Sequence, residues 1–165
     1  RLLEQISTKD PILIGVSFGG MMAIEIGKLI ATAKIVLVSS ARTKLDVPFY
    51  YRLVGHLRLN RMGPTKLFKM TNRLTYWFFG TRTKEEERLL AAIIDDTDAR
   101  FLRWAMDKIV NWDNVTELPG VTTIHGTADK ILPITKADFA IVDGGHFMIV
   151  SKAEELSGLL RKIIA

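Results

Sequence analysis

The chain contains no cysteine among its 165 residues. Disulfide bonds and thiolate metal sites are therefore excluded, and a reducing compartment, the cytoplasm, is the expected location. No apolar run approaches the roughly 18 residues that a membrane-spanning helix needs, so we expect no membrane span. The sequence also has no glycine-rich phosphate loop, no cluster of metal ligands and no dinucleotide-binding fingerprint, and it therefore implies no cofactor and no metal.

Acidic residues are in the minority, with 18 Asp or Glu against 23 Lys or Arg, and the net charge is +5. The basic excess is concentrated in residues 42–88, which contain 11 Lys or Arg and 4 Asp or Glu. A basic segment can attract nucleic acid or anionic lipid. Here the charges alternate with apolar residues at helical spacing, which favours a solvated helix face. We expect no nucleic-acid partner.

Four short apolar runs indicate the fold class. Two of them, residues 11–15 and 33–39, are separated by a helix pattern that ends at about Ile30. Two more follow at residues 121–125 and 139–142. Continuous Val, Ile and Leu runs are typical of parallel strands covered on both faces. The sequence therefore predicts an α/β fold, a parallel β-sheet flanked by helices, whose first visible unit is a right-handed strand–helix–strand crossover.

The segment 43–111 has a different composition, because it is basic, aromatic and largely helical in pattern. Pro64 is placed to open one helix at its first position. Thr83–Glu86 has the spacing of a capping box, which predicts the start of a second helix. A third helix is predicted from Asp98 to Val110.

These patterns predict one α/β core, residues 1–42 and 112–165, with a helical insertion at residues 43–111. Arg1–Ser7 has the pattern of a helix end. A second capping box, Ser151–Glu154, predicts the start of an amphipathic helix that closes the chain.

The most informative motif is Gly15-Val16-Ser17-Phe18-Gly19, which joins the first apolar run to a helix pattern. This strand–turn–helix context is that of a nucleophile elbow, which presents a serine hydroxyl above the sheet. We expect glycine at both Gly15 and Gly19 because a Cβ would collide with neighbouring backbone. The N–H groups that begin the helix can hold an oxyanion. Ser17 is therefore predicted as a nucleophile; the alternative is a glycine-rich turn that only packs well.

A nucleophilic serine needs a base, and the chain has only three histidines. His146 follows the strand at 139–142 and lies on a loop at the carboxyl edge of the sheet, where Ser17 also lies. We predict His146 as the base. His125 ends the preceding strand and is interpreted as a structural residue of the turn, and His56 as a surface or lid residue.

The base in turn needs a carboxylate that fixes its tautomer. Asp129 follows the third visible strand at the same sheet edge and is the predicted partner of His146. Asp143 is too near on the same short loop to reach around the ring, and Asp138 lies at the opposite end of its strand. Two further candidates belong to a helix end, where capping is the simpler interpretation: Asp95 and Asp96.

The chain order Ser17, Asp129, His146 is that of the α/β-hydrolases. With Gly-Val-Ser-Phe-Gly-Gly as elbow, His-Gly-Thr-Ala-Asp-Lys as acid loop and Gly-Gly-His-Phe as base loop, the chain resembles the α/β-hydrolase superfamily over essentially its whole length. The resemblance implies a serine hydrolase with a cap or lid in the insertion and with the Phe18 N–H as an oxyanion donor.

Within that superfamily we expect a carboxylic-ester hydrolase. A thioesterase, an amidase and a carbon–carbon bond hydrolase remain alternatives that use the same three residues. Outside the enzyme class, the alternatives are a non-catalytic hydrolase-like binding protein and an inactive truncated fragment.

Two features depart from the superfamily pattern. About four strands normally precede the elbow, and a loop among them supplies a second oxyanion donor; this chain has neither and resembles the C-terminal part of a hydrolase. We therefore expect self-association or pairing with a missing N-terminal segment. In addition, only 17 positions separate Asp129 from His146, and residues 134–138 are too few for a crossover helix.

The insertion holds the clue to the substrate. Eight of the 14 aromatic residues lie within residues 49–79 of the insertion, and a lid with an apolar underside suits a small-molecule apolar acyl or aromatic ester. Met21, Trp77 and Phe78 are the predicted substrate-binding residues. The alternative is that the rings attach the insertion to the core and that Met21 fills a gap there. The eight aromatic residues are Phe49, Tyr50, Tyr51, Phe68, Tyr76, Trp77, Phe78 and Phe79.

Overall fold

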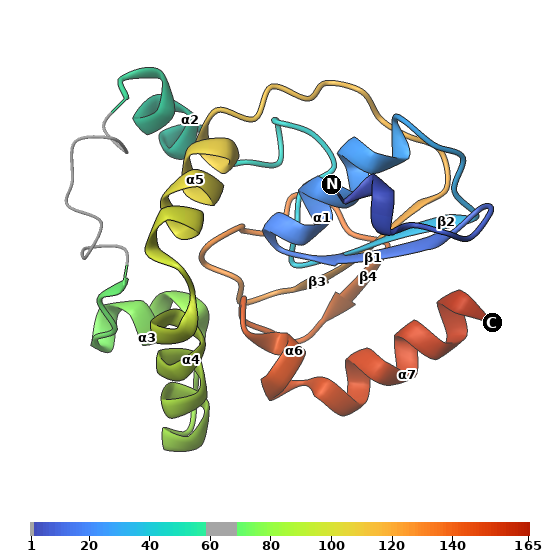
Figure 1. The fold of residues 1–165 in the computed structure, drawn as a ribbon. Coiled ribbons are helices and arrows are strands. Elements are labelled where there is room, and N and C mark those ends of the chain that lie inside the picture. The colour runs from blue at the N-terminus through green and yellow to red at the C-terminus, as the bar shows by residue number, and fades with distance from the viewer. Residues whose placement is uncertain (1, 59–68) are drawn as a thin grey trace.

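The computed structural model describes residues 2–58 and 69–165 (Figure 1). Four strands form one sheet in the order β1-β2-β3-β4, and each neighbouring pair is parallel. This confirms the predicted fold class, a parallel sheet flanked by helices. The strands are β1 (Ile12–Val16), β2 (Lys34–Val38), β3 (Val121–Gly126) and β4 (Phe139–Ile141).

Helices lie on both faces of the sheet and beside it, with α1 and α7 on opposite faces (Figure 1). The helices α2 to α5 all fall between β2 and β3 in the sequence and stand together beside the sheet. The bounds are η1 (Leu3–Gln5, a 3₁₀ turn), α1 (Phe18–Gly27), α2 (Phe49–His56), α3 (Arg73–Phe79), α4 (Lys84–Asp96), α5 (Ala99–Val110), α6 (Met148–Ser151) and α7 (Ala153–Ile164).

Strand β2 shows why the apolar runs form this sheet. Val36 and Val38 pack with side chains of α7, while Ile35 and Leu37 pack with side chains of α1 on the other face. All four are at most 1% exposed. Because both faces of the strand are covered, a continuous apolar run rather than an alternating one is required there.

Strand β1 lies at an edge of the sheet and is less covered. Its pairing partner among the described strands is β2. Ile12 and Ile14, two residues apart and therefore on one face, are 42% and 49% exposed. The edge strand β1 thus exposes apolar side chains on one face of the sheet.

The helix starts that the sequence predicts agree with the structure to different degrees. Asp98 caps α5 as expected, since its carboxylate accepts the N–H groups of Arg100 and Phe101 at 2.9 Å. At α4, Thr83 accepts the Glu86 N–H at 3.1 Å, which is half of a capping box. The Glu86 carboxylate accepts a different N–H, that of Arg82.

The capping box predicted at Ser151 is wrong. Ser151 is the last residue of a short helix, α6, and its hydroxyl donates back to the Phe147 carbonyl at 3.4 Å. The final helix α7 begins two residues later, after Lys152, without a side-chain cap. The Arg1–Ser7 pattern corresponds to the single turn η1, and the helix predicted at Pro64 lies outside the described residues.

Throughout residues 2–58 and 69–165, no helix combines the length and the apolar composition that crossing a lipid bilayer requires.

Candidate active site

Ser17 occupies the turn between β1 and α1 with φ 51° and ψ −122°. Its N–H donates to the Val38 carbonyl at 2.9 Å, and the Ser40 hydroxyl donates to its carbonyl at 2.6 Å. A Cβ on Gly15 would lie 2.4 Å from the Gly19 carbonyl oxygen, so the expectation for Gly15 is confirmed. The expectation for Gly19 is wrong, because a Cβ there, in the exposed first turn of α1, would meet no atom within 4 Å.

Three side chains from three loops form a continuous hydrogen-bonded row. The His146 Nε2 atom lies 2.8 Å from the Ser17 Oγ, and its Nδ1 lies 2.8 Å from an Asp129 carboxylate oxygen. Because an ionised carboxylate only accepts, Nδ1 carries the proton and Nε2 is the acceptor for the serine hydroxyl. The structure therefore brings together all three residues that the sequence motifs predict.

Asp129 is enclosed and fully hydrogen-bonded. Its second carboxylate oxygen accepts the N–H groups of Ile131 and Leu132, each at 2.9 Å. Burial alone would raise the pKa of Asp129, but the hydrogen bonds from His125, from His146 and from the Leu132 N–H outweigh burial and hold the pKa well below its ordinary value. The carboxylate is thus ionised at neutral pH.

The short connection between Asp129 and His146 is bridged without a helix. The two loops that carry these residues are joined directly, because the Ala128 N–H donates to the Gly144 carbonyl at 2.9 Å and the Thr127 hydroxyl accepts the Asp143 N–H at 2.9 Å. These bonds, rather than a crossover helix, fix the distance between the carboxylate and the imidazole.

His125 takes part in this arrangement in a way that the sequence did not reveal. It is 5% exposed, and its Nε2 donates to the Leu132 carbonyl at 2.6 Å while lying 3.4 Å from an Asp129 carboxylate oxygen. His125 thus supports the loop that holds Asp129. His56, by contrast, is exposed at the end of α2.

None of the rejected carboxylates is the observed hydrogen-bond partner of His146 Nδ1, which is Asp129. Asp138 pairs with Arg42 and accepts the N–H and hydroxyl of Thr123. Asp143 lies on the base loop but is exposed, and the two acidic residues at the end of α4, Asp95 and Asp96, are exposed as well.

A cavity of about 320 Å³ runs along α1 and α5, beginning at the residue after Ser17. Phe18 is the first residue of α1, so its N–H has no acceptor within the helix. Its ring meets Trp104 of α5 edge-on, with centroids 5.6 Å apart. The sequence predicted Met21 here but not Trp104 or Trp112, because nothing in the local pattern of residues 99–112 marks them. The lining residues are Phe18, Met21, Met22, Glu25, Trp104, Lys108, Asn111, Trp112 and Asp113.

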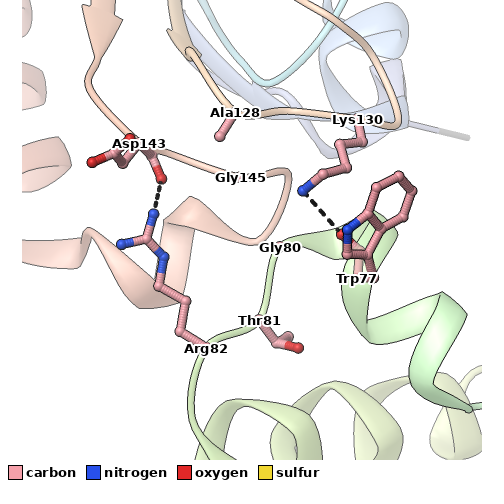
Figure 2. Close-up of a pocket in the computed structure, with 8 residues that line it drawn as sticks. All are labelled: Trp77, Gly80, Thr81, Arg82, Ala128, Lys130, Asp143 and Gly145. Carbon is pink, nitrogen blue, oxygen red and sulfur yellow. Dashed lines mark hydrogen bonds between the residues drawn. The ribbon is translucent and has the colours of Figure 1, made fainter.

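Trp77 and Phe78 do not line that cavity. Trp77 lines a smaller one, of about 140 Å³, between the end of α3 and the acid and base loops (Figure 2). The Lys130 ammonium donates to the Trp77 carbonyl at 3.3 Å and lies 4.7 Å from the centroid of its ring. Phe78 packs edge-on against Trp77, with centroids 4.9 Å apart.

Tyr51 of α2 reaches the core near the elbow, where it packs with Met21, Val47 and Leu132. Burial, with the neighbouring Tyr50 and the Asp129 charge, raises the pKa of Tyr51 to about 12. The phenol is therefore protonated at neutral pH.

A parallel sheet with a serine at a strand–helix turn, and with an acid and a histidine on the loops after two later strands, defines the α/β-hydrolase class of protein. The model of the alpha/beta hydrolase family matches residues 1–159, and the chain belongs to this family. No curated protein sequence matches the chain.

Solved structures agree on the fold. MenH from S. aureus superposes with a TM-score of 0.64 at 16% identity, over 99% of this chain and 71% of that one. A meta-cleavage product hydrolase from Pseudomonas fluorescens superposes with a TM-score of 0.63 at 17% identity, over 99% of this chain and 67% of that one. A thermophilic esterase superposes with a TM-score of 0.56 at 18% identity, over 98% of this chain and 69% of that one. At these identities the likeness concerns the fold.

Proposed function

We propose that the chain is a serine hydrolase in which Ser17 is the nucleophile, His146 the general base and Asp129 the residue that orients the base. The observation that carries the proposal is the pair of 2.8 Å hydrogen bonds that His146 makes, one through each ring nitrogen. Few arrangements other than nucleophilic catalysis require a buried carboxylate, an imidazole and a hydroxyl in one row.

The proposed reaction is acyl transfer to water. His146 Nε2 takes the hydroxyl proton as Ser17 Oγ attacks the substrate carbonyl, and the Phe18 N–H stabilises the resulting oxyanion. The imidazolium returns the proton to the leaving alcohol as the ester bond breaks. Water then attacks the acyl-serine with the same base, which releases the carboxylic acid and restores Ser17.

An apolar carboxylic ester is the substrate class that we propose. The cavity that begins at Phe18 supports it, because aromatic and thioether side chains, Met21 among them, make up most of its lining. A thermophilic esterase is among the proteins of similar fold. We further propose that the helical segment 43–111, which contributes Trp104 to this cavity, acts as the lid over a core of residues 1–42 and 112–165.

A fluorophosphonate probe tests the nucleophile. We expect labelling of the protein, mapped by mass spectrometry to Ser17, and no labelling of Ser17→Ala. Ser7→Ala, in the exposed segment between η1 and β1, is the control and should be labelled as the wild type is. Labelling that survives Ser17→Ala would exclude Ser17 as nucleophile, and a folded wild type that is never labelled would favour a non-catalytic binding protein.

Esters, thioesters, amides and cleavable diketones with the same acyl group then distinguish the bond that is broken. We expect the highest kcat/KM for the ester.

A further inference from the structure

The base loop, which carries His146, is hydrogen-bonded to the end of α3. The Phe147 N–H, one residue after His146, donates to the Phe79 carbonyl at 2.9 Å. This bond joins residues far apart in the sequence, one from the helical segment 43–111 and one from the loop after β4. It joins the last residue of α3 to the residue that follows His146.

Gly80 brings the two backbones into contact. It ends α3 in the left-handed conformation, with φ 75°, and a Cβ on it would lie 2.9 Å from the Gly145 Cα. Any side chain at Gly80 would therefore push against the residue that precedes His146. Glycine is required here by both conformation and space.

The Phe79 side chain contacts the imidazole itself. Its ring centroid lies 5.7 Å from that of His146, with an interplanar angle of 76°. His146 is 7% exposed. Hydrogen bonds to Ser17 and Asp129 hold two atoms of the imidazole, and the Phe79 ring supplies a packing surface against it.

Two further bonds keep the end of α3 in place (Figure 2). The Arg82 guanidinium donates to the Asp143 carbonyl at 2.6 Å, on the base loop, and the Lys130 ammonium donates to the Trp77 carbonyl, from the acid loop. The end of α3 is therefore tied to both loops that carry the row of hydrogen bonds.

We propose that Phe79 and Gly80 are positioning residues that hold His146 within hydrogen-bond distance of Ser17 and Asp129. The expected effect on catalysis rests on the proposed function. The position of the His146 imidazole can be tested without it. A shift of about 1 Å in a reacting group costs on the order of 10²-fold in rate. A change in the contact between the end of α3 and the base loop is therefore expected to change the reaction rate.

Gly80→Ala tests the proposal against a matched control, Gly120→Ala. Both glycines have a positive φ, 75° and 72°, but a Cβ on Gly120 would meet no atom within 4 Å. The two substitutions therefore introduce the same backbone strain, and only the first presses on Gly145. The difference between them isolates the contact with the base loop.

The primary measurement is the proton NMR resonance of the His146 Nδ1–H, which reports the His146–Asp129 hydrogen bond without any turnover. We expect Gly80→Ala to shift or broaden this resonance and Gly120→Ala to leave it as in the wild type. We also expect kcat for the best ester to fall about 10²-fold in Gly80→Ala with little change in KM, because the base and not the binding cavity is displaced.

Phe79→Leu is the second variant, in case Gly80→Ala does not fold. It keeps the carbonyl that Phe147 bonds and an apolar side chain, but it removes the ring next to His146. We expect the same change in the Nδ1–H resonance, smaller in size. Leu74→Ala, on the exposed face of the same helix, is its control.

An unchanged His146 resonance in folded Gly80→Ala and Phe79→Leu would overturn the proposal. Loss of the resonance in Gly120→Ala as well would also overturn it, because general strain would then explain the effect. A wild type that shows the resonance but never reacts with fluorophosphonate would instead overturn the proposed function.

Discussion

Ser17 combines a strained backbone with a well-supported position. A non-glycine residue at φ 51° and ψ −122° costs on the order of 1–3 kcal/mol. Hydrogen bonds from the Ser17 N–H to Val38 and from Ser40 to the Ser17 carbonyl each return about 1 kcal/mol. The turn is therefore held by the end of β2, and this support fixes the direction of the hydroxyl toward His146.

The two buried histidines should differ sharply when each is replaced by alanine. His146→Ala should lower kcat by about 10⁴-fold or more, because the residues of such a row act as a unit. His125→Ala should mainly lower the free energy of unfolding, by about 1–3 kcal/mol, because it leaves the Leu132 carbonyl without its donor. Steady-state kinetics and urea unfolding measure the two effects. An equal loss of kcat in both variants would contradict His146 as the base.

Asp129 should make stability depend on pH. Its pKa is lower in the folded protein than the ordinary 3.8. The carboxylate therefore stabilises the folded state above pH 3.8, and this contribution is lost as the pH falls toward the folded pKa. The difference in the free energy of unfolding between the wild type and Asp129→Asn should be largest at about pH 7 and shrink below about pH 3.8.

Urea unfolding at several pH values measures that difference. Asp96→Asn, which changes an exposed carboxylate at the end of α4, is the control and should show little difference at any pH. A difference for Asp129→Asn that does not change with pH would contradict the assignment of a stabilising ionised carboxylate.

At the scale of elements, the sequence predicts correctly the strands and the helix cap that depend mainly on neighbouring residues. The apolar runs form β1 to β4 because Val, Ile and Leu favour strands, most clearly in β2, which is covered on both faces. Asp98 caps α5 because its carboxylate needs only the next turn of the same helix. The elbow, acid-loop and base-loop motifs name three residues that the structure brings within hydrogen-bond distance of one another; their catalytic role stays a prediction.

What the sequence could not predict depends on contacts between distant segments. Ser151 has a capping pattern, but it lies in the short helix α6, whose Met148 packs into the core. The Ser151 hydroxyl donates to the Phe147 carbonyl of that turn and does not cap α7. The support of Ser17 by Ser40 and of His146 by Phe79 joins segments with no shared pattern. The same holds for the cavity between α1 and α5, which is why Trp104 was missed.

Substitutions in the two cavities are expected to differ in their effect on substrate preference. Trp104→Ala should change the ratio of kcat/KM for long and short acyl esters by about tenfold or more, because a lining ring of the cavity at Phe18 is removed. Trp77→Ala should leave that ratio unchanged, because Trp77 lines the other cavity. A series of acyl esters of increasing length measures both. The reverse result would instead support the sequence-based expectation for Trp77 and Phe78.

For the whole molecule, the edge strand β1 is the main feature that remains open. Its apolar residues Ile12 and Ile14 are about half exposed, and the described strands cover it on the β2 side. An exposed apolar edge strand is a template for pairing with another chain, whether a further segment of the same protein or a second copy. The net charge of +5 opposes association only weakly at physiological ionic strength, since salt screens exposed charges beyond about 8 Å.

We therefore predict that the 165-residue chain self-associates with increasing concentration and that Ile14→Lys reduces this association. A lysine on an edge strand blocks pairing because its charge would have to be buried at the new interface. Leu29→Lys, at a 68% exposed apolar residue outside the sheet, adds the same charge and is the control. Sedimentation velocity over a range of concentrations measures the effect. Equal behaviour of the two variants would show that general surface hydrophobicity, and not the edge of β1, drives association.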